Sequence, residues 1–403
     1  MRALDEKKSV GIESGAIAFY ASAIVLASAY AAIAFLICHR LVFISGTDFY
    51  IHGTTASEFT LSNGLSDFVL NHRYPGWGIC VKLLMMAGMS LSASASLVTA
   101  SFSFLVVLVS MFIAYEIIGG KRYVLPLAVG VIVVFVSAIY VPWFNEQIYL
   151  GQGSPTIWHN PTYIAVRPFS LLSCYVLYVS LKGRRLTLRL GVIYSLLTVI
   201  CLLIKPSFFQ FQFPAIVLFC IIDYALNRDL AFCLKLLSTF LPGLLIAAAQ
   251  FVLLFGIGNT ESNTGISFTF FGNLVYSSNS PFRPFSVLLL LAFPLFSIWA
   301  LREDIFSKGS PYWVLIIMFL VAFSEAMCFK ETGLRENHGN FMWGYYNSVF
   351  ILWAFLLPLF LKRSLVDRSM SIPVMVIGFS LVALHFASGC ILCATFLDGS
   401  QTL

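Results

Sequence analysis

Charged residues are scarce in this sequence. Asp, Glu, Lys and Arg make up 10% of its 403 positions, against about 25% in a typical soluble domain. Hydrophobic residues make up 59% of the chain, and its mean hydropathy is +0.90. So little charge cannot cover a water-exposed surface, which excludes a soluble enzyme. The composition predicts an all-α protein that crosses a membrane many times.

Several motifs of nucleotide and metal chemistry are also missing. The chain contains no Walker A or G-x-G-x-x-G loop, no nucleophile elbow, no H-E-x-x-H and no Cys/His zinc set. ATP bound by this chain therefore cannot drive its reaction, and no nucleic-acid partner is expected. A reaction here needs a donor substrate that arrives already activated.

Apolar stretches dominate what is present. A membrane-spanning helix needs about 20 mostly apolar residues. The stretch 74–90 is apolar but short, opens with Pro75 and carries Lys82, so we expect a helix lying at the membrane interface there. We predict eleven spans, near 15–38, 93–118, 124–143, 163–181, 188–204, 208–226, 231–256, 284–301, 311–329, 342–361 and 372–397.

Basic residues indicate the orientation, because they accumulate in cytoplasmic loops. With the N-terminus inside and eleven spans, sixteen of the 24 Lys and Arg residues fall on the cytoplasmic side. The loops 39–92, 144–162, 257–283 and 330–341 then lie outside, together with five of the six histidines. The sequence thus predicts a single integral-membrane domain over 1–403, in a bacterial inner membrane, with an extracytoplasmic active site.

The first outer loop begins with "SGTDFYIHGTTASEF", residues 45–59. If a helix starts here, Asp48 and His52 are four residues apart and share one face. An ionised carboxylate at the membrane boundary is costly unless it has partners or a chemical role. Asp48 is therefore either a general base within reach of an acceptor hydroxyl or the N-cap of an interfacial helix.

The second outer loop and the start of the following span carry five more candidates: Glu146, Trp158, His159, Asn160 and Arg167. Aromatic rings could stack on the apolar face of a sugar while amides bind its hydroxyl groups, a mixture that suits a carbohydrate pocket. The alternative is that the Trp and Tyr residues belong to the aromatic belt at the membrane interface.

Basic residues also lie at predicted outer helix ends, although Lys and Arg usually accumulate on the cytoplasmic side. They are Arg167, Lys205, Arg283, Lys330 and Arg335. Such groups suit a phosphate or diphosphate at the bilayer surface, since Arg donates two parallel hydrogen bonds and Lys acts as a point charge. The alternative is snorkelling, or attraction to anionic lipid.

The predicted span 311–329 contains Glu325 near its outer end. A carboxylate within a membrane helix costs about 2.5–3.5 kcal/mol on insertion scales, so it is a functional candidate that needs a partner. Lys330 or Arg335 could be that partner, and His338 lies in the polar cluster that follows.

No His, Cys, Asp or Glu spacing matches a metal signature, so no metal ligand is assigned. A Mg²⁺ or Mn²⁺ ion held by Asp48, Glu146 and a substrate phosphate stays open as an alternative.

The layout resembles the GT-C superfamily of integral-membrane glycosyltransferases. The resemblance lies in "TDFYIHGTTA" just after the first span and in "YPGWGICVKLLMMAGMSLSASASLV" before the second, and it covers about 1–170. It implies juxtamembrane helices in the first outer loop, with Asp48 as catalytic base and Glu146 as the second-loop acid. It also implies that Lys205 and the outer arginines bind a lipid phosphate. A metal-binding D-x-D is absent from this first loop.

The resemblance implies transfer of a sugar, with inversion, from a polyprenyl-phosphate-linked donor to a hydroxyl of a surface-glycan or lipid-linked acceptor. His52, Trp158, His159, Asn160 and His338 would orient the two sugars. Three alternatives remain, one of which is a structural scaffold within a polysaccharide assembly complex. The segment around Arg335 and His338 is faintly similar to polysaccharide polymerases, and an oligosaccharide flippase would place polar groups such as Glu325 along a membrane pathway.

Overall fold

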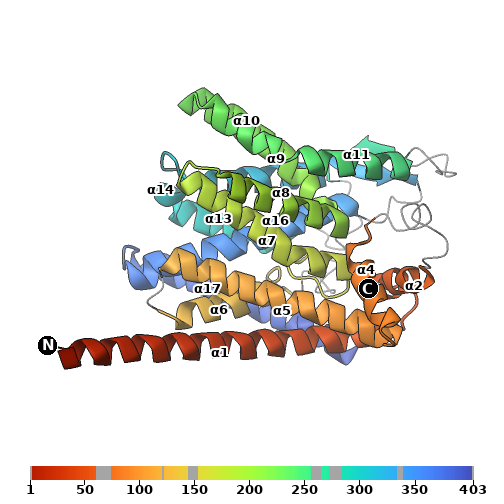
Figure 1. The fold of residues 1–403 in the computed structure, drawn as a ribbon, viewed down its shortest axis with the longest axis horizontal. Helices are drawn as coiled ribbons and strands as arrows, with labels where there is room; N and C mark the ends of the chain where they lie inside the picture. Colours follow the sequence, from red (N-terminus) through yellow and green to blue (C-terminus); the bar gives the residue numbers. More distant parts are fainter. Residues whose placement is uncertain are drawn as a thin grey trace.

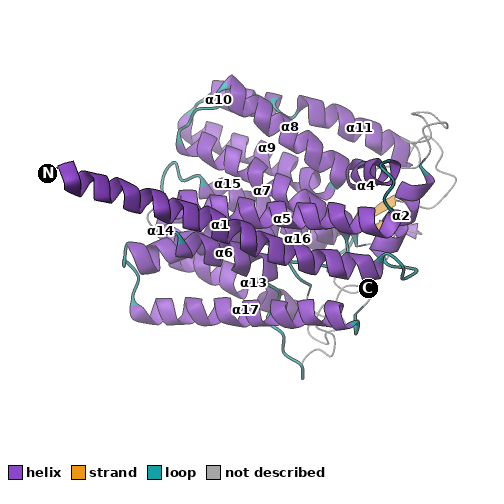
Figure 2. Cartoon of the chain, turned by 60° about the horizontal axis from the view of Figure 1, so that its bottom comes forward, coloured by secondary structure: helices purple, strands orange, loops and turns teal. Residues whose placement is uncertain are grey.

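The computed structural model describes residues 2–59, 74–119, 122–143, 153–255, 265–271, 283–333 and 339–401, with side chains omitted for 2–14, 253–255 and 283–284. The described residues are helical almost throughout, apart from one two-stranded antiparallel sheet (Figure 2). The elements are α1 (Arg2–Leu41), α2 (Asp48–Glu58), α4 (Gly76–Met86), α5 (Leu91–Ile118), α6 (Val124–Phe135), α7 (Pro161–Lys182), α8 (Leu188–Ile204), α9 (Ser207–Asn227), α10 (Leu230–Ser238), α11 (Leu241–Phe255), β1 (Gly265–Phe268), α13 (Arg283–Ala300), α14 (Arg302–Ile305), α15 (Tyr312–Cys328), β2 (Phe329–Thr332), α16 (Asn340–Leu361), a π-helical turn (Lys362–Val366) and α17 (Ile372–Asp398).

The predicted all-α class is confirmed. In the described part of the chain, fewer helices than the eleven predicted are long and apolar enough to span a membrane. Within the described residues six helices are long and apolar enough to cross a membrane: α1, α5, α7, α9, α16 with its π-helical turn, and α17. The helices α10 and α11 meet at 45° and make a seventh if they form one broken span. Each remaining predicted range also holds an apolar helix (α6, α8, α13 and α15), but these helices are shorter.

The helix α16 lies at the centre of the bundle. It packs against α5, α6, α7, α9, α13 and α15, and it is apolar on every side. A helix that is hydrophobic all round belongs in a core rather than at a surface. Its Trp353 is fully buried and stacks on Phe293 of α13, with ring centroids 4.3 Å apart.

The predicted helix 124–143 ends early, at Phe135, and the chain then runs extended through the bundle. Extended backbone leaves amide groups that must find partners outside their own segment. The Ser137 N–H donates to the carbonyl of His385 on α17 at 3.2 Å. Gly389 allows this approach, because a Cβ there would lie 1.2 Å from the Phe135 carbonyl oxygen.

The stretch 74–90 forms the short helix α4 of 11 residues, which is too short to span a bilayer. It packs on α2, and both helices lie at the end of the bundle where α1 ends (Figure 1). The Trp77 Nε1–H of α4 donates to Thr99 Oγ1 of α5 at 3.2 Å, which ties this pair to the bundle. We call this the site end of the molecule.

Candidate functional site

Asp48 is the first residue of α2, and Thr47 is its N-cap. The Thr47 hydroxyl accepts the Tyr50 N–H at 3.1 Å and donates to the Leu41 carbonyl at 2.8 Å, which fixes the turn between α1 and α2. The interpretation of Asp48 as the helix cap is therefore wrong. The expected helix does place Asp48 and His52 one turn apart on α2, and the Asp48 carboxylate has another partner.

That partner is Asn160, which is the N-cap of α7. Its Oδ1 accepts the N–H of Tyr163 at 2.8 Å and the hydroxyl of Thr162 at 2.9 Å. Because both bonds need an acceptor, the amide NH₂ must face the other way, where Nδ2 donates to Asp48 Oδ2 at 2.7 Å. Capping of α7 thus orients the amide that holds the carboxylate.

Lys205 reaches the same place from the junction of α8 and α9. The residue before a proline disfavours helical backbone, so Pro206 ends α8 and leaves Lys205 extended at φ −158°. Lys205 is 8% exposed, and its Nζ donates to Thr162 Oγ1 at 3.2 Å and to Asn160 Oδ1 at 3.4 Å. One amide therefore bridges a carboxylate and an ammonium group.

Two histidines complete this cluster, which we define as Asp48, His52, His159, Asn160 and Lys205. The ring of His52 lies 6.4 Å from that of Trp77, and His159 is buried. Loss of hydration lowers the pKa of each histidine to about 4, although the nearby Asp48 acts in the opposite direction. Both imidazoles are neutral at pH 7, so Lys205 supplies the positive charge of the cluster.

The charge on Lys205 is itself sensitive to pH. Burial lowers its pKa from 10.5 to about 8, and the attraction of Asp48 only partly offsets this effect. Its ammonium group also lies 4.4 Å from the centre of the Trp343 ring, a cation–π contact that stabilises a buried cation.

A cavity of about 320 Å³ adjoins the cluster, and Lys205 belongs to both. Most of the remaining lining is apolar or aromatic, and two of its polar residues bond to each other, with the Asn340 amide donating to the Glu331 carboxylate. The lining residues are Tyr74, Leu202, Lys205, Pro206, Ser207, Phe209, Gln210, Ala247, Gln250, Phe251, Ile266, Glu331, Asn340, Phe341 and Trp343.

The predicted outer loop 144–162 is described from residue 153 onward, and residues 153–160 are all buried. Several polar groups of this segment bond within it or to the start of α7: the Ser154 hydroxyl donates to the Thr156 carbonyl at 2.6 Å, and the Tyr163 hydroxyl donates to the Pro155 carbonyl at 2.9 Å. Trp158 is 2% exposed and packs between Tyr30 and Phe135. Trp158 is therefore a core residue here, and Trp343 is the tryptophan that lines the cavity.

Arg167 also lies in the interior, about two turns into α7 from the cluster. Its side chain is fully buried, with Nη2 3.5 Å from the Tyr30 hydroxyl and the guanidinium over the rings of Tyr163 and Phe350. It does not line the cavity.

Other candidates lie apart from the cluster or beyond the described residues. Glu325 lies on the last turn of α15, partly exposed, and does not line the cavity. Arg283 is the first residue of α13, and only its backbone is described. Glu146, Arg335 and His338 lie outside the described residues.

The described residues contain no group of three His, Cys, Asp or Glu side chains placed to hold a metal ion. The alternative Mg²⁺ or Mn²⁺ site includes Glu146, which lies outside the described residues. That site therefore stays a prediction.

Sequence reasoning missed three residues of the candidate site: Thr162, Glu331 and Trp343. The pattern Asn160-Pro161-Thr162 was a usable signal for Thr162, because Asn followed by Pro at the first helical position is typical of a helix start. No local pattern places Glu331 or Trp343 beside Lys205, since these three residues meet only through the packing of α8, α9, α16 and the sheet.

Comparisons with protein-family models, with curated proteins and with solved structures found no match to this chain, so its function has to be inferred from the geometry of the site.

Proposed function

We propose that this protein is a membrane glycosyltransferase of the GT-C type. It transfers a sugar from a polyprenyl-phosphate-linked donor to a hydroxyl group of a glycan or lipid-linked acceptor on the extracytoplasmic face. The proposal rests chiefly on one observation, the carboxylate of Asp48 and the ammonium group of Lys205 held by a single amide beside a largely apolar cavity.

The cavity supports a lipid-linked donor. Lys205 in its wall offers a partly desolvated positive charge for a phosphate, and Phe209, Phe251 and Ile266 offer apolar surface for the first part of a lipid chain. Ligand pockets commonly combine apolar lining with a few placed polar groups. A charge in such a low-dielectric place acts more strongly on an anion than it would in water.

The chemistry follows from the two charged ends of the cluster. The Asp48 carboxylate, which stays partly exposed, removes the proton of the acceptor hydroxyl. The acceptor oxygen forms a bond to the anomeric carbon as the bond from that carbon to the phosphate oxygen breaks, and the electron pair leaves with the phosphate. Lys205 stabilises the negative charge that develops on the leaving group, and displacement from the opposite side inverts the anomeric centre.

We also propose that all eleven apolar ranges cross the membrane, with α10 and α11 as one broken span and α6, α8, α13 and α15 as short spans within the bundle. The two termini lie at opposite ends of the molecule, which supports an odd number of passes (Figure 1).

Cysteine labelling in cells tests this topology. In a variant free of its nine native cysteines, Glu58→Cys at the site end should react with a membrane-impermeant maleimide in intact cells. Arg185→Cys and Lys308→Cys, both exposed at the opposite end, should react only after lysis. Reaction of Arg185→Cys in intact cells would contradict the proposed orientation.

The pH dependence of transfer tests the role of Lys205. Its positive charge is present below a pKa of about 8 and is lost as the pH rises above it. We therefore expect kcat/KM for the donor to fall above about pH 8, while Lys205→Arg, with a pKa above about 12, should retain its residual activity to higher pH. A falling limb at the same pH in both proteins would assign the titration to another group.

The reaction itself is tested by mass spectrometry of surface glycan from cells with and without the protein. Loss of one sugar from the glycan is the expected result. A collapse of chain length with unchanged composition would instead indicate a polymerase. Transport of a labelled lipid-linked oligosaccharide without a new glycosidic bond would indicate a flippase.

A further inference from the structure

A second pocket lies at the end of the bundle opposite to the site end. Its volume is about 290 Å³, and α5, α7, α15, α16 and the turn after α14 all contribute to its lining. Figure 1 shows α14 at this end and α2 and α4 at the other. Under the proposed topology this pocket opens to the cytoplasm, and none of its residues belongs to the cluster around Asp48.

Three lysines from three separate elements line this pocket. Lys182 ends α7, Lys308 lies in the turn between α14 and α15, and Lys362 follows α16. Lys182 and Lys308 are exposed and Lys362 is partly buried, so the ammonium groups are accessible from water. These three positive charges come from distant parts of the chain and line one pocket. Such an arrangement favours binding of an anion.

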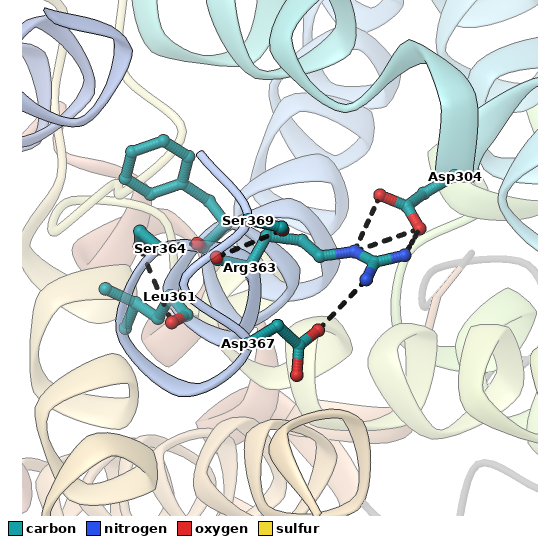
Figure 3. Close-up of polar contacts among 7 residues, drawn as sticks. Asp304, Leu361, Arg363, Ser364, Asp367 and Ser369 are labelled. Carbon is teal, nitrogen blue, oxygen red and sulfur yellow. Dashed lines mark hydrogen bonds and ion pairs between the residues drawn. The ribbon is translucent and has the colours of Figure 1, made fainter. Parts of the chain in front are cut away.

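Two carboxylates, those of Glu116 and Asp304, also line the pocket, and that of Asp304 is already held in an ion pair. Asp304 of α14 accepts hydrogen bonds from Arg363 Nε at 3.1 and 3.0 Å and also from Nη2. The other side of the same guanidinium donates to Asp367 at 3.0 Å (Figure 3). Arg363 is thus shared between two carboxylates. Counted together with Arg363 and Asp367, the lining carries four positive and three negative side chains, so a net positive charge remains, and the three lysines are its cations without a carboxylate partner among the described residues.

The start of α15 adds to the positive potential. The 17-residue helix α15 begins at Tyr312, and Ser310, Pro311 and Tyr312 all line the pocket. The positive end of the helix dipole lies at this first turn and favours an anion. Pro311 has no N–H and the Ser310 N–H donates to the Ser307 carbonyl at 3.0 Å, so the helix start contributes through its dipole. The Ser310 hydroxyl already accepts the Tyr312 N–H at 3.3 Å, so this hydroxyl is held at the pocket wall.

We propose that this pocket binds a phosphate-bearing anion at the end of the molecule remote from the transfer site. The lysines, the helix start and the polar lining recognise the phosphate group itself. Two sources carry that chemistry, the headgroup of an anionic phospholipid in the adjoining leaflet and a soluble phosphate.

The experiment uses the purified full-length protein in a zwitterionic detergent. Binding of dihexanoyl phosphatidylglycerol and of inorganic phosphate is measured by titration calorimetry, with dihexanoyl phosphatidylcholine as the control for the acyl chains. The pocket variant combines Lys182→Gln, Lys308→Gln and Lys362→Gln. The matched variant, Arg185→Gln with Arg189→Gln and Lys235→Gln, removes three exposed positive charges that do not line the pocket.

Binding of the anionic probe should be about tenfold weaker in the pocket variant and unchanged in the matched variant, because three modest electrostatic contributions add up to roughly one order of magnitude. Binding of phosphatidylglycerol alone would identify the lipid headgroup, and equal binding of inorganic phosphate would identify a soluble ligand. No binding of either probe, or an equal loss in both variants, would overturn the proposal. If the pocket variant has a lowered melting temperature, Lys308→Gln alone provides the test, with about twofold weaker binding expected.

Discussion

Replacing Asp48 with Asn should reduce sugar transfer about 10³-fold, within the range expected for loss of a general base. Asn has the same shape as Asp and can still accept the hydrogen bond that Asn160 Nδ2 donates at 2.7 Å. The local structure should therefore be preserved, while the group that removes the acceptor proton is lost. Transfer is measured as modified glycan per unit of inserted protein.

Glu58→Gln is the matched control for this substitution. Glu58 is the last residue of the same helix and is exposed, so the change also removes one carboxylate from α2. We expect Glu58→Gln to leave transfer and the melting temperature unchanged. A transfer rate within a few fold of the native rate in Asp48→Asn would remove Asp48 as the base.

Replacing Lys205 with Met should lower kcat/KM for the donor by about 10²–10³-fold, the effect of removing one charge-stabilising group from a site. Met keeps most of the length and apolar volume of the lysine stem. Lys205→Arg should recover part of the loss, because it restores a positive charge. The measurement is donor-dependent transfer at a fixed pH near 7.

Lys205→Met should lower transfer without lowering the stability of the folded protein. This difference separates a functional role of Lys205 from a structural one. The pKa of Lys205 is lower in the folded protein than its ordinary value, so the unfolded chain binds this proton more tightly. At neutral pH the cost of burying the ammonium group therefore weakens the folded state, and Met removes that cost. Asp48 loses the attraction of the ammonium group, but it is partly exposed and keeps the hydrogen bond from Asn160. We expect an equal or higher melting temperature for Lys205→Met. A large loss of stability together with unchanged transfer would contradict the assigned role.

Parts of the site could be predicted because local rules produce them. Pro206 ends α8 whatever surrounds it, so Lys205 had to stand at a helix end. Asp48 follows the first apolar range directly and begins a helix that also carries His52. These features depend on a few neighbouring residues, and the structure has them where the sequence placed them.

Other parts could not be predicted because they depend on contacts between distant residues. The bond from Asn160 to Asp48 joins positions 112 residues apart, and the contact from Lys205 to Asn160 joins positions 45 residues apart. The apolar run of α6 continues past Phe135, yet the helix ends there because neighbouring helices bind the extended backbone. Trp158 had a loop-like neighbourhood in sequence and a core position in space.

The sequence by itself determined that this is a helical membrane protein, where its apolar helices lie, and which acidic and basic residues stand at their ends. Periodicity, apolar length and proline are local properties, so they can be read along the chain. Only the tertiary structure decided which of those polar groups meet, because a hydrogen bond across the bundle depends on how several helices pack together. The pairing of Asp48 with Lys205 through Asn160 is a result of that packing.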